Sequence, residues 1–303
     1  MELIRSREWY STGDGSDRGY IQPHQLKELW FHTGTACNLS CDFCLEGSGP
    51  GDQRLGLVKL EDVKPYIERA VEMGVEQFSF TGGEPFLAKD LVKILELASQ
   101  YAPCLVLTNG TEALQKRLHQ LDVLKQSKHP VSFRISIDSP DPQEHDAGRG
   151  EGMYDSALEG MKALVDLGFH VSLARHMKDG EDTPAIEAQY REQLAQRQIP
   201  SDINFVAFPD FLPPGSDGHG PDISTNCMTQ YHTEDTRRSF MCAFSKMIVK
   251  QNGRMRVYAC TLVDDDPEYD LGEDLGQALE HRISMKHHRC FSCFKYGSSC
   301  SET

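Results

Sequence analysis

Residues 29–44 read LWFHTGTACNLSCDFC. The stretch opens with a short apolar run, typical of a buried strand, and continues into Cys37, Cys41 and Cys44 with C-x3-C-x2-C spacing. A structural zinc site closes with four ligands, whereas this group supplies three. Three cysteines therefore favour an iron–sulfur cube in which one iron keeps an open position for a substrate or cofactor.

Beyond residue 44, strand-like and helix-like segments alternate. Short apolar runs predict the strands, and apolar residues three and four apart predict the helices. This alternation is typical of βαβ units with a parallel sheet. Together with 29–33, the predicted strands are 76–81, 104–109, 131–138, 170–177 and 203–208, and the predicted helices are 59–73, 87–100, 112–125, 154–167 and 183–197.

The strand at 131–138 (VSFRISID) helps to choose between an open doubly wound sheet and a partial barrel. Its apolar residues alternate with Arg134, Ser136 and Asp138, so one face is polar. The second and sixth predicted strands also alternate. A sheet covered by helices on both faces would be apolar almost throughout. The alternative explanation of these polar residues is that they are scattered polar groups near strand ends. Agreement among three strands favours an α/β fold, a partial (β/α)6 TIM-like barrel with a polar lumen.

The alternation stops after residue 210. Residues 211–228 are rich in Pro and Gly and predict a linker, and Asn252-Gly253 predicts a hairpin beyond it. The last segment is small for a core of its own, so a metal cluster would stabilise it. We expect an N-terminal extension over 1–28, a core domain over 29–210 and a small cysteine-rich cluster-binding domain over 229–303.

The composition restricts the partners. The chain of 303 residues has a formal net charge of -15 and a pI near 5.2, which argues against nonspecific binding to nucleic acid or to an anionic membrane. No apolar run approaches the length of a membrane span, and the charged start is unlike a signal peptide. We expect a soluble, cytoplasmic protein with no nucleic-acid or membrane partner.

Four short motifs together resemble the radical S-adenosylmethionine (SAM) enzymes, over residues 29–208. They are the three-cysteine pattern after the first predicted strand, TGGEP at 81–85, TNG at 108–110 and SID at 136–138. Each lies at the carboxyl end of a predicted strand, where βα proteins build their sites. Motif, order and strand position agree independently, which makes the resemblance specific.

The resemblance implies a set of cofactor contacts. Cys37, Cys41 and Cys44 would hold a [4Fe–4S] cluster whose fourth iron chelates SAM, and one electron would cleave SAM to a 5′-deoxyadenosyl radical that abstracts hydrogen from the substrate. A flavodoxin or ferredoxin is the implied reductant. Arg149 would pair with the SAM carboxylate or form an ordinary ion pair in a surface loop. The other implied SAM contacts are Phe43 beside the adenine, Gly82 and Gly83 in close backbone approach, Glu84 at the ammonium, Thr108 and Asn109 at the neighbouring strand end, and Ser136 and Asp138 at the ribose or carboxylate.

The C-terminal cysteines resemble the auxiliary-cluster region of the twitch and SPASM branch of this family. The spacing C-x17-C at Cys242 and Cys260, followed by C-x2-C at Cys290 and Cys293, is closer to the single-cluster twitch version. We expect one auxiliary [4Fe–4S] cluster on these four residues, with Cys300 as a competing fourth ligand. A zinc site on the same cysteines is the alternative.

The sequence leaves three functions open. A radical SAM enzyme that dehydrogenates or rearranges a small molecule is favoured, because 28 residues before the first strand are too few for the winged-helix domain of many peptide-modifying relatives. The alternatives are a radical SAM peptide maturase, which forms a crosslink or thioether, and a non-catalytic iron–sulfur or zinc protein. The GGEP, TNG and SID motifs argue against the last of these.

Substrate contacts are predicted from basic residues that would face the lumen. Two or more such residues would favour an anionic substrate group; the candidates are His32, Arg134, Arg175 and His176. The acidic run at 264–266 predicts a solvated loop.

Overall fold

The computed structural model describes residues 5–178, 180–209 and 220–297. Its main sheet has eight strands in the order β7-β6-β5-β4-β3-β2-β8-β9. Strands β2 to β7 are parallel and lie side by side in chain order, so the predicted partial barrel of six βα units is confirmed. Their bounds are β2 Glu28–His32, β3 Gln77–Thr81, β4 Cys104–Thr108, β5 Val131–Ser136, β6 His170–Met177 and β7 Phe205–Pro209.

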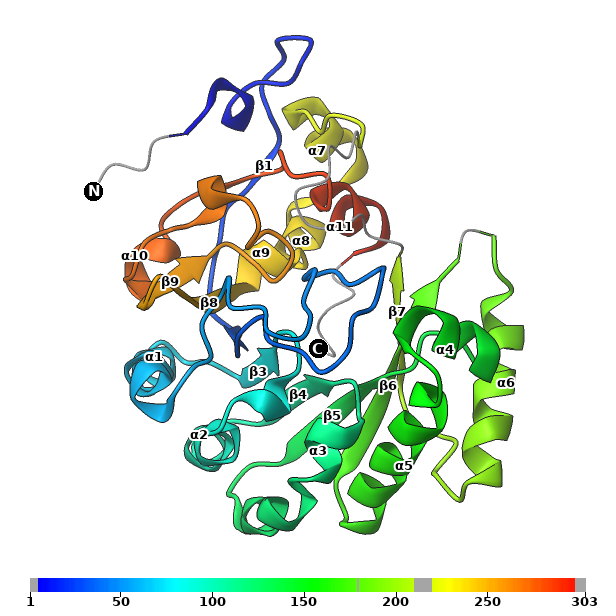
Figure 1. The fold of residues 1–303 in the computed structure, drawn as a ribbon. Coiled ribbons are helices and arrows are strands. Elements are labelled where there is room, and N and C mark those ends of the chain that lie inside the picture. Colours follow the sequence, from blue (N-terminus) through cyan, green and yellow to red (C-terminus); the bar gives the residue numbers. More distant parts are fainter. Residues whose placement is uncertain (1–4, 179, 210–219, 298–303) are drawn as a thin grey trace.

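Helices connect these strands and cover the outer face of the sheet (Figure 1). Gly74 and Gly168 end two of them with positive φ angles of 81° and 88°, a conformation that glycine adopts without strain. The helices of the barrel are α1 Leu60–Glu72, α2 Leu91–Ala98, α3 Glu112–Gln115, α4 Pro142–Arg149, α5 Met153–Asp166 and α6 Thr183–Gln196.

The helix predicted over 112–125 is wrong in type. Only α3 is α-helical there, and a 3-10 helix follows over Leu118–Gln126. Leu118, Leu121 and Leu124 recur at every third residue, and a 3-10 helix with three residues per turn places all three on one face. Leu121 and Leu124 are buried. The α-helical period fitted the same leucines only approximately.

The predicted hairpin is confirmed as β8 Ser245–Gln251 and β9 Arg254–Tyr258, which are antiparallel. Asn252 and Gly253 have φ angles of 51° and 75°, as a tight hairpin turn requires. Strand β8 also pairs in parallel with β2, and Glu28 lies opposite Ser245. The C-terminal part of the chain therefore continues the barrel sheet.

The remaining elements gather around β8 and β9, above the barrel in the view of Figure 1. Strand β1 Tyr20–Ile21 pairs antiparallel with β10 Ile283–Ser284, so the N-terminal segment packs on the C-terminal part. Residues 211–219, half of the predicted linker, lie outside the described residues, and α7 begins within its last four residues. The helices here are α7 Thr225–Tyr231, α8 Glu234–Arg238, α9 Met241–Phe244, α10 Leu275–Ala278 and α11 Cys290–Tyr296, with 3-10 turns at Arg7–Trp9, Pro85–Leu87 and Pro267–Tyr269.

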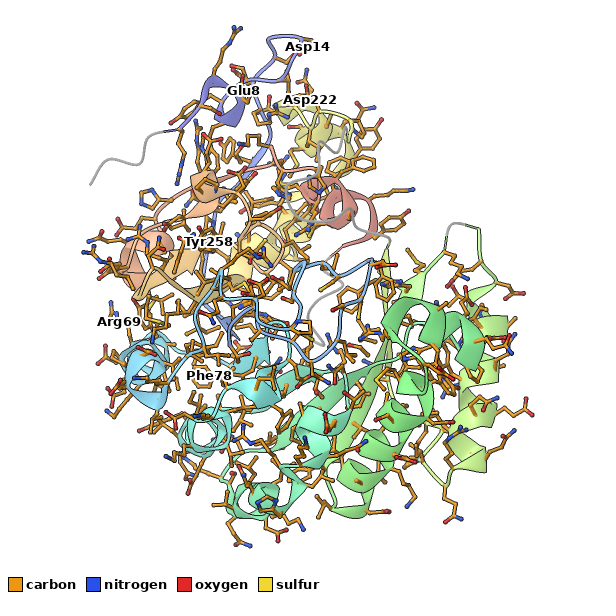
Figure 2. All side chains as sticks on the ribbon, viewed as in Figure 1. Glu8, Asp14, Arg69, Phe78, Asp222 and Tyr258 are labelled. Carbon is orange, nitrogen blue, oxygen red and sulfur yellow. The ribbon has the colours of Figure 1, made fainter. Side chains whose placement is uncertain are left out.

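One continuous hydrophobic core joins the barrel to the C-terminal part. Phe78 of β3 is fully buried, and Tyr258 of β9 is 1% exposed (Figure 2). The rings of Trp9 and Tyr269 lie 4.9 Å apart, which brings the N-terminal segment into the same core. Among the described residues, no helix combines the length and apolar character that crossing a membrane needs.

Candidate functional site

A cavity lies over the carboxyl ends of the barrel strands. The loop after β2 brings Cys37, Cys41 and Cys44 to its wall, and Phe43 lies among them. The parallel strands end at one edge of the sheet, so their terminal residues gather on this cavity. From β3 to β6 it is lined by Thr81, Gly82, Gly83, Thr108, Asn109, Ser136, Asp138, Arg175 and His176, and Arg149 of α4 completes this side.

Two of the three thiols accept hydrogen bonds of the kind that cluster ligands accept. The Leu39 N–H donates to Cys37 Sγ at 3.4 Å, and the Ser48 N–H donates to Cys44 Sγ at 3.4 Å. Such bonds stabilise sulfur that carries negative charge. Burial raises the pKa of Cys37 to about 11, so the free thiol would keep its proton, whereas iron would displace that proton. The donor set fits three irons of a [4Fe–4S] cluster.

The glycine pair of the TGGEP motif lies directly against the cysteine loop. The Gly83 N–H donates to the Gly34 carbonyl at 2.9 Å. A Cβ on Gly83 would lie 2.4 Å from the Ala36 carbonyl oxygen, and one on Gly82 would lie 2.7 Å from that of Gly34. Backbone packing inside the chain therefore already requires both glycines. Their close approach to SAM stays a prediction.

Glu84 connects the ends of β3 and β4. It is fully buried, and its carboxylate accepts from Thr108 Oγ1 at 2.8 Å and from the backbone N–H groups of Phe86 and Asn109 at 3.0 and 2.9 Å. Burial raises the pKa of Glu84, and the three donors act in the opposite direction. The predicted contact with the SAM ammonium stays a prediction, because Glu84 lies behind the residues that line the cavity.

Arg149 forms an ion pair in the cavity wall. Its Nη2 donates to Asp138 Oδ1 at 3.0 Å, and both side chains are little exposed. Burial opposes ionisation of Asp138, but the Arg149 guanidinium, with smaller contributions from His176 and His145, lowers the pKa of Asp138. The rings of Phe43 and His176 lie 4.4 Å apart on the same side. The pair thus belongs to the site itself, although the predicted pairing with a SAM carboxylate is untested.

The predicted basic lining is only partly present. Arg175 and His176 line the cavity, but Arg175 pairs with Glu181 at 2.6 Å. Arg134 is fully buried and His32 does not reach the wall. The positive charge of Arg175, which would favour an anionic substrate group, is therefore already compensated by Glu181.

Sequence reasoning missed a buried polar cluster beneath the cavity. Atoms of His32, Glu46 and Asp264 lie within 4.8 Å of one another, and Glu46 reaches the cavity wall. His32 Nδ1 accepts from the Gly34 N–H at 3.2 Å, so its Nε2 carries the proton and donates to Glu46 at 3.0 Å. A metal on Nε2 would leave the ring with no proton. The cluster therefore acts as a hydrogen-bonded network rather than as a metal site.

The prediction that the acidic run at 264–266 forms a solvated loop is therefore wrong. Burial, together with the neighbouring Glu46 carboxylate, raises the pKa of Asp264 to about 7. Asp265 pairs with His287 at 3.1 Å, and Asp266 pairs with Lys286 at 2.9 Å. Three adjacent acids predict a solvent-exposed loop when nothing is known of their partners. Here the basic partners come from distant segments of the chain.

A second group of cysteines gathers in the C-terminal part. Cys242 of α9, Cys260 after β9, and Cys290 and Cys293 of α11 line one small cavity. Cys242 and Cys260 are buried, and the other two are partly buried. Cys300 lies outside the described residues. The four cysteines therefore line one cavity, and their role as ligands of an auxiliary cluster stays a prediction.

The two cavities share a wall. Leu262, two residues after Cys260, lines both of them. Arg289 is 2% exposed, and its guanidinium donates to the Leu45 carbonyl at 3.0 Å and to the Leu262 carbonyl at 3.3 Å. Since Leu45 follows Cys44, this side chain ties the two cysteine-bearing loops together.

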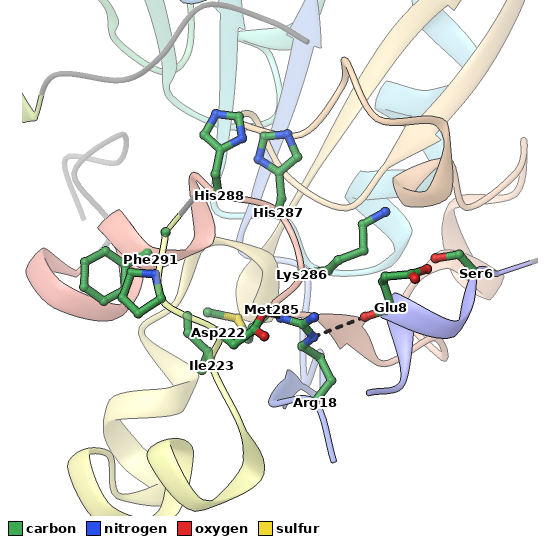
Figure 3. A pocket seen from close by; sticks show the side chains of 12 residues that line it. Ser6, Glu8, Arg18, Asp222, Ile223, Met285, Lys286, His287, His288 and Phe291 are labelled. Carbon is green, nitrogen blue, oxygen red and sulfur yellow. Dashed lines mark hydrogen bonds and ion pairs between the residues drawn. The ribbon is translucent and has the colours of Figure 1, made fainter. Parts of the chain in front are cut away.

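Another cavity, of about 310 Å³, lies between the N-terminal segment and the residues before α11 (Figure 3). Its principal cations are already engaged. Arg18 pairs with Asp222 at 2.5 Å and donates to the Glu8 carbonyl at 3.1 Å, and Lys286 pairs with Asp266. The barrel cavity, where the motifs converge, is the better candidate for the site.

Comparison with known proteins supports this assignment. The chain is 34% identical over 182 residues to the antilisterial bacteriocin subtilosin biosynthesis protein AlbA of Bacillus subtilis, covering 57% of this chain and 40% of that protein. It is 30% identical over 136 residues to GTP 3′,8-cyclase of Haemophilus ducreyi, covering 44% and 39%. The chain therefore spans about two fifths of these relatives' length.

The fold is also that of a solved relative. The crystal structure of Streptococcus suis SuiB bound to S-adenosylmethionine superposes with a TM-score of 0.63 at 14% identity, covering 85% of this chain and 66% of that one. These similar proteins are enzymes of the SPASM and twitch type. The sequence pattern of the radical SAM superfamily matches residues 31–185, just over half of the chain. The chain therefore belongs to the radical SAM superfamily of enzymes, which use SAM together with a [4Fe–4S] cluster.

Proposed function

We propose that the protein is a radical SAM peptide maturase that carries a second iron–sulfur centre. The observation that carries this proposal is the four-cysteine cavity, which shares a wall with the cavity of the first cysteine loop. AlbA, by its name, acts in bacteriocin biosynthesis, and SuiB has been crystallised with its precursor peptide. These similarities reverse the sequence-based preference for a small-molecule substrate.

The first site would hold the catalytic cofactors. We assign Cys37, Cys41 and Cys44 to the [4Fe–4S] cluster, on the basis of their shared cavity and of the N–H groups directed at the sulfurs of Cys37 and Cys44. When bound, the cluster and SAM supply the radical that removes hydrogen from the substrate. The proposed SAM contacts are Phe43, Gly82, Gly83, Glu84, Thr108, Asn109, Ser136, Asp138 and Arg149.

The second site favours an iron–sulfur cluster over zinc. Zn–S bonds of about 2.3 Å in a tetrahedron would bring the sulfurs to about 3.8 Å from one another. Among the described residues, no three of the thiols of Cys242, Cys260, Cys290 and Cys293 lie within 4.8 Å of one another. The wider spacing and the cavity between them suit a cluster bound by four cysteines. Four protein ligands leave no iron open to substrate, so this centre would accept an electron.

The arrangement suits oxidation of a substrate held between the two centres. Thr261 and Leu262 close the cavity from the C-terminal side, and Arg289 fixes Leu262 relative to the first loop. The substrate would lose a hydrogen atom on one side and an electron on the other, and the proton would go to solvent or to a neighbouring base. Crosslink or thioether formation has this balance. We propose residues 29–210 as the catalytic core and 229–303 as the second-centre domain, with a flavodoxin or ferredoxin as reductant.

A small-molecule substrate is the second candidate. The similarity to GTP 3′,8-cyclase, whose name gives a nucleotide as its substrate, favours it. That similarity covers 44% of the chain, whereas the similarity to AlbA covers 57%. The peptide reading therefore comes first.

The test uses anaerobically reconstituted protein. We expect about eight irons per chain in the wild type, and about four in a Cys37/Cys41/Cys44→Ala variant and in a Cys290/Cys293→Ala variant. With dithionite, 5′-deoxyadenosine should form from SAM only when the first site is intact. Synthetic peptides encoded beside the gene should then lose two hydrogens by mass spectrometry. Modification of nucleotides in place of every such peptide would favour the second candidate.

A further inference from the structure

The two cysteine sites differ in their charged surroundings. Near the first, the Glu46 carboxylate lines the cavity, and the Arg149 guanidinium is neutralised by Asp138. Near the second, two cations are almost completely buried: Arg289, which lines the cysteine cavity, and Lys246 of β8. A charge held out of water acts strongly on its neighbours, because little solvent screens it.

Lys246 is the less compensated of these two cations. Its exposed fraction is 0%, and its ammonium donates to the carbonyl oxygens of Cys242 and Ser245, each at 2.8 Å. Carbonyl oxygens satisfy the donors but carry no net charge. None of the salt bridges among the described residues involves Lys246, whereas Arg289 lies 3.9 Å from the Asp265 carboxylate.

The anionic groups that would act on Lys246 belong to the second site. If Cys242 and Cys260 bound a cluster as thiolates, their negative charge would offset the burial that disfavours the charged form of Lys246. A lysine is retained inside a protein only when something compensates its desolvation. A cluster with four thiolate ligands would supply that compensation.

We propose that Lys246 raises the reduction potential of the second centre and so makes it an electron acceptor. The inference rests on the proposed iron–sulfur centre at Cys242, Cys260, Cys290 and Cys293. Reduction adds one negative charge to such a centre, and a fixed cation stabilises the reduced form more than the oxidised form. The first site, with the Glu46 carboxylate beside it, has no matching cation among the described residues that line it, apart from Arg149 and Arg175, which are paired.

The experiment isolates the second centre in full-length protein. A Cys37/Cys41/Cys44→Ala parent would be reconstituted, and its midpoint potential measured by redox titration followed by electron paramagnetic resonance. Lys246→Gln keeps hydrogen-bond donors without the charge, Lys246→Met removes both, and Lys246→Arg keeps the charge. Lys250→Gln is the matched control, since Lys250 lies four residues further along β8 on the same face and pairs with Asp62 at 2.5 Å.

We expect both neutral Lys246 variants to lower the equilibrium constant for reduction at least tenfold, which is about 59 mV for one electron. Lys246→Arg and Lys250→Gln should stay within a factor of three of the parent. Neutral variants that hold their iron but titrate like the parent would overturn the inference. So would loss of iron in both neutral variants with retention in Lys246→Arg, because Lys246 would then serve assembly. A parent with no cluster would instead refute the proposed second centre itself.

Discussion

Replacing Glu84 by Gln tests whether this buried carboxylate mainly connects strand ends or mainly awaits SAM. In the structure each carboxylate oxygen accepts from a backbone N–H, and Oε1 also accepts from Thr108. A Gln side chain must place its NH2 group against one of these N–H donors. One buried donor then loses its acceptor, which costs about 1–3 kcal/mol. Removing the desolvated negative charge offsets part of this, so we expect a net loss of about 2 kcal/mol.

The assay is anaerobic calorimetry of reconstituted protein, with and without SAM. A loss of about 2 kcal/mol should lower the melting temperature by about 4 °C in a chain of this size, even without SAM. Thr108→Val is the control, since it leaves the Glu84 carboxylate intact. It removes the hydroxyl that donates to Glu84 and accepts from the Gly110 N–H at 3.1 Å, and should cost about 1–2 kcal/mol. If Glu84→Gln melts like the wild type without SAM and loses only the stabilisation that SAM adds, the reasoning from the internal network is refuted.

Three other substitutions test separate parts of the site. Gly83→Ala would place a Cβ 2.4 Å from the Ala36 carbonyl oxygen, so SAM affinity and iron at the first site should fall at least tenfold, while iron at the second site stays; equal loss of iron at both sites would contradict this. For Asp264, a folded pKa near 7 against 3.8 for an ordinary Asp means that the folded form holds an extra proton between about pH 4 and 7. The stability of the wild type then falls as pH rises through this window. Asp264→Asn cannot titrate, so its stability relative to the wild type should rise between pH 5 and pH 8, as melting temperatures measured at both pH values will show. A constant difference in melting temperature would count against the buried pairing with Glu46. Arg149→Met leaves a buried carboxylate without its partner and should weaken SAM binding more than tenfold by calorimetric titration, whereas unchanged affinity would place the pair outside the SAM site.

The barrel and the positions of its site residues could be predicted because they depend on local patterns. Each strand is a short run of apolar residues or of alternating apolar and polar residues, and the structure moves the predicted ends by no more than two residues. Once the strands are parallel, residues such as Thr108 and Ser136 must meet at one edge, whatever the details of packing. The side chains of this edge were therefore foreseeable from order along the chain alone.

Long-range pairings could not be predicted in the same way. Asp264 meets His32 across more than two hundred residues, and no local pattern at either position indicates the other. Glu46, next to a recognised motif, lacked a signal because its role depends on that distant contact. The prediction of an α-helix over 112–125 failed for a different reason. The spacing of the leucines at 118, 121 and 124 suits two kinds of helix, and packing decided between them.

The pairing of β2 with β8 has a consequence for how the protein is made. One neighbour of β2 is β3, which follows soon in the chain, but the other is synthesised more than two hundred residues later. Until then β2 exposes a row of unpaired backbone groups, which can pair with strands of other chains. The loop with the first three cysteines leaves directly from this strand. We therefore expect iron to be inserted after the ribosome has passed residue 251, and rapid overproduction to yield aggregates in which this edge has found the wrong neighbour.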